Sequence, residues 1–324
     1  MRLNQPFLQL PISFCAKTLA EEVRALPNSA WMPHPTGFVG NEAVPLVTPE
    51  GAMTDKFEGP MAPTPPLLRC PYIMEIMAEL GCVWGRSRLM GLAPGRDVPP
   101  HVDSHYYWRT HHRIHIPVIT NPGVSFSCGP ETVHMAEGEC WMFDNFRWHN
   151  VQNKGSEQRV HLVLDTVGGE RLHELVEAAR AGAAPNSQTL LPGQRSSDGL
   201  DFEQVNAPTV MSPWEISSHI DFITGFVLPD PALDKVAKRL AKFVDAWIAA
   251  WARFGAEDQG LPTYRRLMET TRQDLHALGG GHLMLRNKIA MYEMLDQLIF
   301  AMAAPLREAD LHGTAPAAQQ RLAS

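Results

Sequence analysis

Two residues with the spacing of a metal-binding pair, His101 and Asp103, lie in a histidine-rich stretch of the chain. In a β-strand, residues two apart project from the same face, so this imidazole and this carboxylate could bind one ion. His149, beside a later strand-like run, is the best candidate for a third ligand. Two imidazoles and one carboxylate on one face of an ion form the facial triad of non-haem Fe(II) oxygenases, which leaves positions for a cosubstrate and O₂. The pair alone is a weak signal, because a surface histidine followed by a turn aspartate has the same spacing.

A candidate anion-binding residue, Arg159, follows His149 by ten positions and opens the alternating run RVHLVLD. The planar guanidinium binds a carboxylate through two parallel hydrogen bonds, which suits the distal carboxylate of a cosubstrate such as 2-oxoglutarate. The competing interpretation is that Arg159 pairs with Asp165 or another acid at the rim of the sheet. Because Arg159 lies on the polar face of its run, we favour the anion-binding role.

These side chains need strands to bring them together. In HRIHIPVI, Arg113 and His115 share one face, and Ile114, Ile116 and Val118 share the other. The run that starts at Arg159 alternates in the same way. Many short strand-like runs separated by Gly and Pro turns predict a sandwich or barrel. Arginine and histidine on the polar faces of two strands indicate a polar interior, such as the mouth of a small barrel that holds an anion.

The stretch before these strands shows less order. A strand and a helix are expected within the first 30 residues, and a helix is expected over 71–80. Between them, residues 31–66 are rich in Pro, Gly and Met and show no sustained periodicity. This pattern predicts a long irregular segment, for which a loop lying over a site and a poorly ordered excursion are equally good interpretations.

Helical periodicity replaces strand alternation in the last third of the chain. Ser212 and Glu215 form a capping box at the start of this region. Helices are expected between Pro231 and Gly255, over 263–277 and over 283–303. The stretch rich in Pro, Ser, Gln and Asn that precedes Ser212 predicts a linker or long surface loop. The expected divisions are therefore a β domain with an N-terminal extension, a linker and a helical subdomain, over 1–182, 183–211 and 212–312.

The ordered set of motifs resembles the aspartyl/asparaginyl β-hydroxylase family of Fe(II)/2-oxoglutarate dioxygenases, and within it the bacterial L-proline cis-4-hydroxylases. The motifs are HVD at 101, RIHIPV at 113, the run over 133–144, His149 and RVHLVLD at 159. The resemblance covers about residues 84–168. It implies a mainly β fold with added helices, in which a double-stranded β-helix (a cupin-like jelly roll) is followed by the α-helical subdomain.

The resemblance also implies roles for individual residues. His101, Asp103 and His149 would be the catalytic iron ligands, and Arg159 would anchor the C5 carboxylate of 2-oxoglutarate. Arg113 and His115 would contact the cosubstrate as well. The implied cofactors are Fe(II), 2-oxoglutarate and O₂, with ascorbate as an activator in vitro.

The activity that follows from the resemblance is hydroxylation of an unactivated C–H bond. We expect the substrate to be a free amino acid or a small amino-acid derivative. One alternative is an Asp, Asn or other residue in a peptide or protein. A second alternative, from a different class, is a non-catalytic or 2-oxoglutarate-independent metal-binding cupin.

Net charge, hydropathy and cysteine content restrict the possible partners and location of the protein. The net charge of −7 over 324 residues is unlike a nucleic-acid-binding protein, so no nucleic-acid partner is expected. No apolar run is long enough to span a bilayer, and the N-terminal stretch lacks a signal-peptide pattern. Five cysteines without CxxC spacing indicate reduced thiols in a cytoplasmic protein. The sequence leaves a homodimer as one possible oligomeric state.

Overall fold

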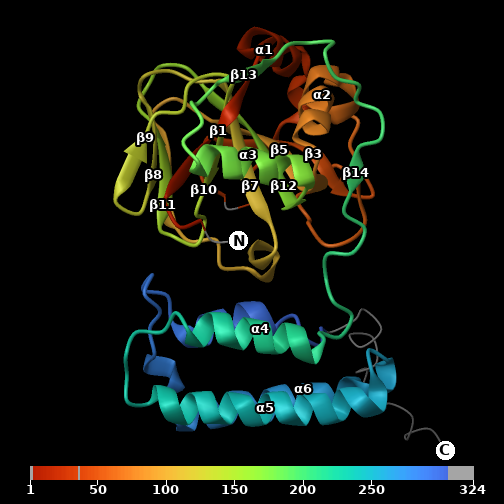
Figure 1. Cartoon of the computed structure of the whole chain (residues 1–324), viewed down its shortest axis with the longest axis vertical. Coiled ribbons are helices and arrows are strands. Elements are labelled where there is room, and N and C mark those ends of the chain that lie inside the picture. Colours follow the sequence, from red (N-terminus) through yellow and green to blue (C-terminus); the bar gives the residue numbers. More distant parts are fainter. Residues whose placement is uncertain (1–2, 36, 306–324) are drawn as a thin grey trace, which may run out of the picture. The chain divides into compact units, whose positions relative to one another are not determined.

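The computed structural model describes residues 3–35 and 37–305 (Figure 1). The chain divides into two compact units, Met1–Ala207 and Pro208–Ser324. Residues 306–312, the end of the helical subdomain expected from the sequence, lie outside the described residues. Among the helices described, none has the length and hydropathy needed to cross a membrane.

The first unit contains two β-sheets. The larger sheet consists of β1 (Phe7–Phe14), β2 (Met32–Pro33), β3 (Asn41–Pro49), β4 (Met61–Pro63), β5 (Val83–Leu92), β7 (His112–Ile119), β10 (Glu139–Phe143), β12 (Arg159–Gly168), β13 (Gln188–Leu190) and β14 (Asp201–Phe202). The smaller sheet consists of β6 (Arg96–His101), β8 (Val124–Cys128), β9 (Glu131–Val133) and β11 (His149–Asn153). The strands β13 and β14 lie within the segment expected to be a linker, and they pair with β1 and β5.

The strand order identifies a jelly roll. Four of the strands between β5 and β12 form the order β10-β7-β12-β5 in the larger sheet, and the other four form β6-β11-β8-β9 in the smaller sheet. The chain therefore passes repeatedly from one sheet to the other, which defines the double-stranded β-helix. Figure 1 shows β8, β9 and β11 to one side of β10 and β7. The fold class predicted from the sequence is confirmed.

The larger sheet has one apolar face, and helices cover it. The apolar side chains of the two alternating strands, such as Ile114, Ile116 and Leu162, are fully buried in the main core. They share this core with α1 (Ala16–Ala25), α2 (Pro71–Leu80) and α3 (Glu170–Arg180) through residues such as Leu19, Ile76 and Leu172. Because side chains alternate along a strand, Arg113, His115, Arg159 and His161 project from the opposite face.

The expectation of an irregular segment over 31–66 is wrong in part, because β3 lies within it. This strand pairs with β5 along most of its length. Six of its nine residues are buried in an unbroken pattern rather than in alternation, and Pro45 stands at a shift in register. A strand buried on both faces shows no period of two, and a proline within it conceals it further.

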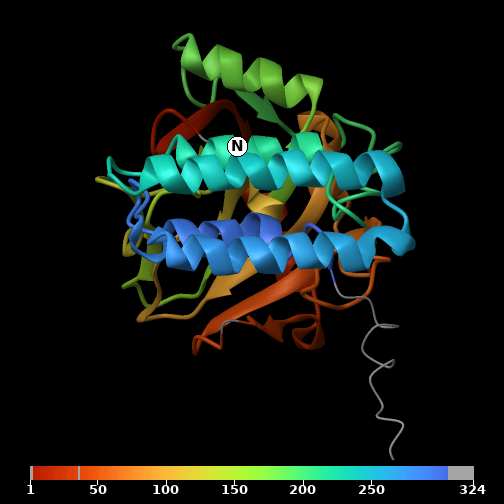
Figure 2. The ribbon, with the colours of Figure 1, turned by 90° about the horizontal axis from the view of Figure 1, so that it is seen from below.

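The second unit is helical. Its helices are α4 (Pro213–Thr224), α5 (Leu233–Phe254), α6 (Leu261–Ala277) and α7 (Met291–Leu295), and a π-helical turn follows at Asp296–Phe300. The Ser212 hydroxyl accepts a hydrogen bond from the Glu215 backbone N–H at 3.3 Å, which confirms the predicted cap. Figure 2 shows α5 and α6 side by side, and the rings of Trp247 and Tyr264 pack between them with centroids 4.5 Å apart.

The helix expected over 283–303 is wrong in its first half. Met284 and Ala290 form an antiparallel bridge, so the chain turns back on itself between them. Lys288, with a φ of 65°, occupies the left-handed region in that turn, which a continuous helix does not allow. Helical structure starts only at Met291.

The five cysteines are free, in agreement with the expected reduced thiols. Cys128 and Cys140 are fully buried in their strands, where they pack as small apolar residues. Short 3₁₀ helices connect the larger elements. They are Asn28–Ala30, Leu67–Arg69, Tyr106–Arg109, Asp258–Gly260 and Gly280–His282.

Candidate active site

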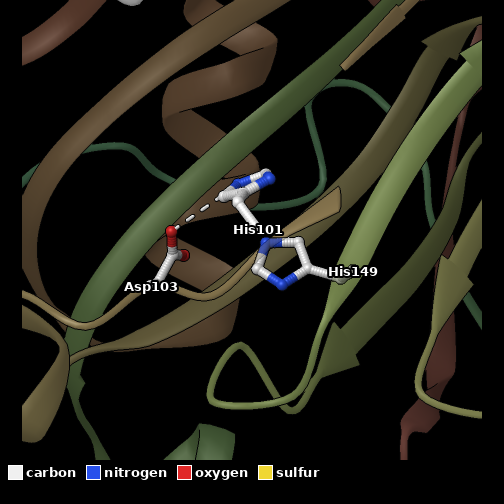
Figure 3. A group of neighbouring side chains, drawn as sticks. All are labelled: His101, Asp103 and His149. Atoms are coloured by element: carbon white, nitrogen blue, oxygen red, sulfur yellow. Dashed lines mark ion pairs between the residues drawn. The ribbon is translucent and has the colours of Figure 1, made fainter. Parts of the chain in front are cut away.

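The pairing of β6 with β11 brings the three predicted metal ligands together. His101 is the last residue of β6 and lies directly opposite His149, the first residue of β11. Their ring centroids are 4.2 Å apart, and Asp103 follows in the loop after β6 with Oδ1 3.8 Å from His101 Nε2 (Figure 3). One ligand atom from each residue lies within 4.8 Å of the others. In the part of the chain that the structure describes, no other group of His, Cys, Asp and Glu meets this condition.

Backbone carbonyls fix the orientation of both imidazoles. His101 Nδ1 lies 2.9 Å from the Pro99 carbonyl oxygen, and His149 Nδ1 lies 2.9 Å from the Arg147 carbonyl oxygen. A carbonyl oxygen only accepts, so each Nδ1 carries the proton and donates it. Each Nε2 is thereby left with its lone pair, which is the form of histidine that binds a metal.

Charge and burial favour the metal-binding forms of these residues. Burial lowers the pKa of His149 to about 4, so the imidazole is neutral at pH 7. Burial also acts to raise the pKa of Asp103, but Arg113 and the other positive charges nearby outweigh it and hold that pKa below its usual value. The site therefore presents a neutral imidazole and an ionised carboxylate without a metal to stabilise them.

Arg113 is held between two carboxylates. Its Nε and Nη2 donate to the two carboxylate oxygens of Asp165 at 2.9 and 3.2 Å, and its Nη1 lies 3.4 Å from Asp103 Oδ2. Its guanidinium carbon also lies 4.1 Å from the centroid of the Trp108 ring. The sequence placed Arg113 on the inward face but did not reveal Asp165 as its partner, which depends on the register between β7 and β12. Arg113 thus orients the Asp103 carboxylate.

Arg159 lies on the same face but lacks such a partner. It is 4% exposed, and its Nε and Nη2 find no hydrogen-bond partner among the described residues. Burial lowers its pKa to about 9, with no acid opposing the effect. The competing interpretation of an ion pair with Asp165 is wrong, because six residues along a strand separate the two by about 20 Å. Asp165 is bound by Arg113 instead.

Two buried histidines accompany Arg159. His115 and His161 place their Nδ1 atoms 3.4 Å apart, and neither Nε2 has a hydrogen-bond partner in the described chain. Burial, reinforced by the charge of Arg159, lowers the pKa of both well below the ordinary value. Buried polar groups are normally satisfied, so three adjacent unsatisfied side chains indicate a place for a bound polar or anionic group.

Other histidines near the site have structural partners. His111 pairs with Glu203 at 3.0 Å and stacks on Tyr107. His105 Nδ1 accepts a hydrogen bond from the Tyr107 backbone N–H at 3.2 Å, which caps the 3₁₀ helix Tyr106–Arg109. Neither belongs to the metal-binding group. Glu203, distant in sequence from every predicted site residue, had no signal in the sequence.

Comparison with known proteins identifies the region that contains this site. Residues 61–168 match the aspartyl/asparaginyl β-hydroxylase family. The match spans a third of the chain and includes all six predicted site residues. No curated protein matches the chain.

Three solved structures are among those to which the chain is similar. A 2OG-Fe(II) oxygenase family oxidoreductase from Burkholderia pseudomallei is 13% identical over 48% of this chain and 81% of its own, with a TM-score of 0.35. A cupin domain from Bordetella pertussis is 18% identical over 25% and 79%, with a TM-score of 0.21. A predicted oxalate decarboxylase from Thermotoga maritima is 16% identical over 42% and 89%, with a TM-score of 0.26. These scores are too low to transfer an activity.

Proposed function

We propose that the protein is an Fe(II)/2-oxoglutarate-dependent dioxygenase that hydroxylates a free amino acid or a small amino-acid derivative. The observation that carries the proposal is the combination of two ligand sets on facing sheets. His101, Asp103 and His149 lie close enough together to bind one metal ion, and Arg159 is a buried guanidinium without a counter-ion among the described residues. A single ligand that chelates a metal and carries a distal carboxylate satisfies both.

The residues present fit both groups. The Nε2 atoms of His101 and His149 and the carboxylate of Asp103 would hold the iron, since two imidazoles and one carboxylate are the donor set of non-haem Fe(II) oxygenases. Arg159 would bind the C5 carboxylate of 2-oxoglutarate, and His115 would contact the cosubstrate beside it. When bound together, iron, 2-oxoglutarate and O₂ supply the oxidising power that hydroxylates a C–H bond, with succinate and CO₂ as coproducts.

The protein's own contribution is positioning. Arg113, itself held by Asp165, keeps the Asp103 carboxylate ionised and oriented. The carbonyls of Pro99 and Arg147 fix the two imidazoles. Because Arg159 and its neighbouring histidines are buried, the distal carboxylate would be bound away from water, where a charge-assisted hydrogen bond is strongest.

The proposal is tested by cosubstrate binding and by turnover. Anaerobic addition of Fe(II) and 2-oxoglutarate should give the metal-to-ligand charge-transfer band, and a screen over amino acids and short peptides with ascorbate should give substrate-dependent succinate. Both signals should disappear in His101→Ala and Asp103→Ala. Asp97→Ala, which removes an exposed aspartate from the same strand β6, is the matched control and should keep both.

The outcome also separates the alternatives. A band with succinate released only by peptides would move the substrate to a residue in a polypeptide. Metal binding without the band would favour a 2-oxoglutarate-independent cupin. Full turnover in both ligand variants would overturn the assignment of the metal site.

A further inference from the structure

The inward face of the larger sheet carries a second buried arginine that lacks an acidic partner, Arg88 on β5. We propose that Arg88 binds a carboxylate group of the substrate, which places the carboxylate end of the substrate against this strand. The proposal rests on the proposed function for its cosubstrate but concerns a different residue and a different ligand.

The sheet register places Arg88 on the face that carries the site. Arg88 lies directly opposite Val163 of β12, and Val163 lies directly opposite His115 of β7. Residues opposite one another in register project from the same face. Arg88 therefore shares the inward face with His115, and it is only 4% exposed.

The guanidinium of Arg88 has a single weak hydrogen-bond contact. Its Nη1 lies 3.4 Å from Nε2 of His34, and no carboxylate among the described residues forms an ion pair with it. Burial, together with the charge of Arg88, lowers the pKa of His34 to about 3, so this imidazole is neutral. A neutral partner does not compensate a buried charge, which is costly unless an anion pairs with it.

The acids of this face are already engaged. Asp165 accepts two hydrogen bonds from Arg113 and lies 3.9 Å from the Nε of Arg86. Asp103 also lies against Arg113, and it belongs to the metal-binding group. Arg86 and Arg113 thus lie against these carboxylates, and Arg88, which is buried, forms an ion pair with neither of them.

The cosubstrate cannot satisfy Arg88 and Arg159 together. Arg159 lies opposite Leu92, four residues along β5 from Arg88, which separates the two backbones by about 13 Å. In the proposed function, one carboxylate of 2-oxoglutarate meets Arg159 and the other chelates the metal. Arg88 therefore needs an anion of its own, and an arginine fork with one neutral imidazole suits a monoanionic carboxylate.

His34 contacts Arg88 at the proposed subsite. It directly follows β2, it is partly exposed, and its backbone N–H donates to the Asn41 carbonyl at 2.9 Å across the turn into β3. His34, at the start of the β2–β3 connection, thus contacts the guanidinium of Arg88. A small molecule bound there would have its carboxylate between Arg88 and a partly exposed imidazole.

Free amino acids and their carboxamides test the proposal. The full-length protein with Fe(II) and 2-oxoglutarate, kept anaerobic, would be titrated with the standard L-amino acids and the carboxamide of each. Both the charge-transfer band and the melting temperature would be followed. At least one free amino acid should perturb the wild type, and its carboxamide should bind about 10- to 100-fold more weakly, as expected for a lost charged hydrogen bond.

Arg88→Gln should lose this preference for the carboxylate, with both forms bound as weakly as the carboxamide is in the wild type. Arg69→Gln, the same change at an exposed arginine, is the matched control and should keep it. The melting temperature of ligand-free Arg88→Gln should equal or exceed that of the wild type, because an unpaired buried charge has been removed. If Arg88 instead had a structural role, the melting temperature of Arg88→Gln would be lower than that of the wild type.

Several results would overturn the proposal. In Arg88→Gln, they are an unchanged preference for the carboxylate, a loss of affinity for 2-oxoglutarate, or a lower melting temperature without ligand. In the wild type, the contrary result is no response to any amino acid. A wild type without the charge-transfer band would defeat the proposed function. If the melting temperature still rose with a free amino acid, and only when Arg88 was present, the carboxylate subsite would stand alone.

Discussion

Two clusters at the inward face of the larger sheet, one of which includes Asp103 from the loop after β6, differ in how their charges are compensated. The paired cluster, defined by Asp103, Arg113 and Asp165, is satisfied by its own members, with guanidinium–carboxylate distances of 2.9 to 3.4 Å. The unpaired cluster, defined by Arg159, His115 and His161, is fully buried but has polar atoms without partners among the described residues. We infer from this difference that the paired cluster stabilises the fold and that the unpaired cluster binds a ligand.

The contrast has a physical basis. A metal ligand must keep one orientation whatever else is bound, so a neighbouring ion pair that fixes Asp103 is useful at all times. A residue that binds an exchangeable carboxylate must be available each time the ligand returns, so an internal partner would compete with it. The unpaired cluster accordingly lowers the stability of the ligand-free protein, which is a common feature of binding sites.

The largest expected effect is the decrease in stability when Asp165, the acid shared by Arg113 and Arg86, is replaced. Asp165→Asn leaves Arg113 and Arg86 buried without their carboxylate, so the free energy of unfolding should fall by about 3–5 kcal/mol. Urea denaturation measures this change. Asp97→Asn, at an exposed position on β6, should lie within about 0.5 kcal/mol of the wild type. A loss below about 1 kcal/mol in Asp165→Asn would mean that the pairing does not stabilise the fold.

The next effect is stabilisation of the unpaired cluster by its ligand. With Fe(II) under anaerobic conditions, 2-oxoglutarate at 100 times its dissociation constant should raise the free energy of unfolding by about 2.7 kcal/mol. Arg159→Gln should remove most of this gain at the same ligand concentration. Pyruvate, a 2-oxo acid without the distal carboxylate, is the matched ligand and should stabilise much less. Equal stabilisation by both acids would separate Arg159 from carboxylate binding.

A smaller effect of opposite sign is expected without any ligand. Arg159→Met replaces a buried, unsatisfied guanidinium with an apolar side chain of similar length, so the free energy of unfolding should rise by about 1–3 kcal/mol. The same change at Arg113 should lower it, because Asp165 would then be buried without its main partner. Chemical denaturation of the two variants under identical conditions shows whether each change raises or lowers the free energy of unfolding. Destabilisation of both would show that Arg159 has a structural role.

Sequence reasoning found the inward face but not the pairing on it. Alternation along β7 and β12 was enough to place Arg113, His115 and Arg159 on one polar face, because side-chain direction is a property of a single strand. The partner of Arg113 could not be found in this way. Asp165 lies opposite Arg113, 52 residues away in the chain, only because of the register between β7 and β12, and the sequence does not specify that register.

The strand β3 and the turn before Met291 were not predicted, for different reasons. The strand β3 is buried on both faces, so it lacks the period of two that marks a half-exposed strand. The turn before Met291 looked helical because Leu285 and Ile289 are four residues apart, a spacing that a helix also shows. The left-handed Lys288 that breaks the helix carries no sequence signal, since lysine rarely adopts that conformation.

The smallest expected effect is a pH dependence that distinguishes the two clusters. Burial lowers the pKa of His161 well below its unfolded value of about 6.5, so below that pH the unfolded chain binds a proton that the folded chain does not. Stability therefore falls as the pH decreases from 6.5, and His161 contributes up to about 1.4 kcal/mol per pH unit to the slope. His161→Asn has no group to protonate, so its unfolding free energy measured from pH 6.5 to 5 should decline less steeply by about that amount. His173→Asn, at an exposed position on α3, should keep the wild-type slope. Identical slopes in the two variants would mean that the unpaired cluster already tolerates a proton in the folded protein.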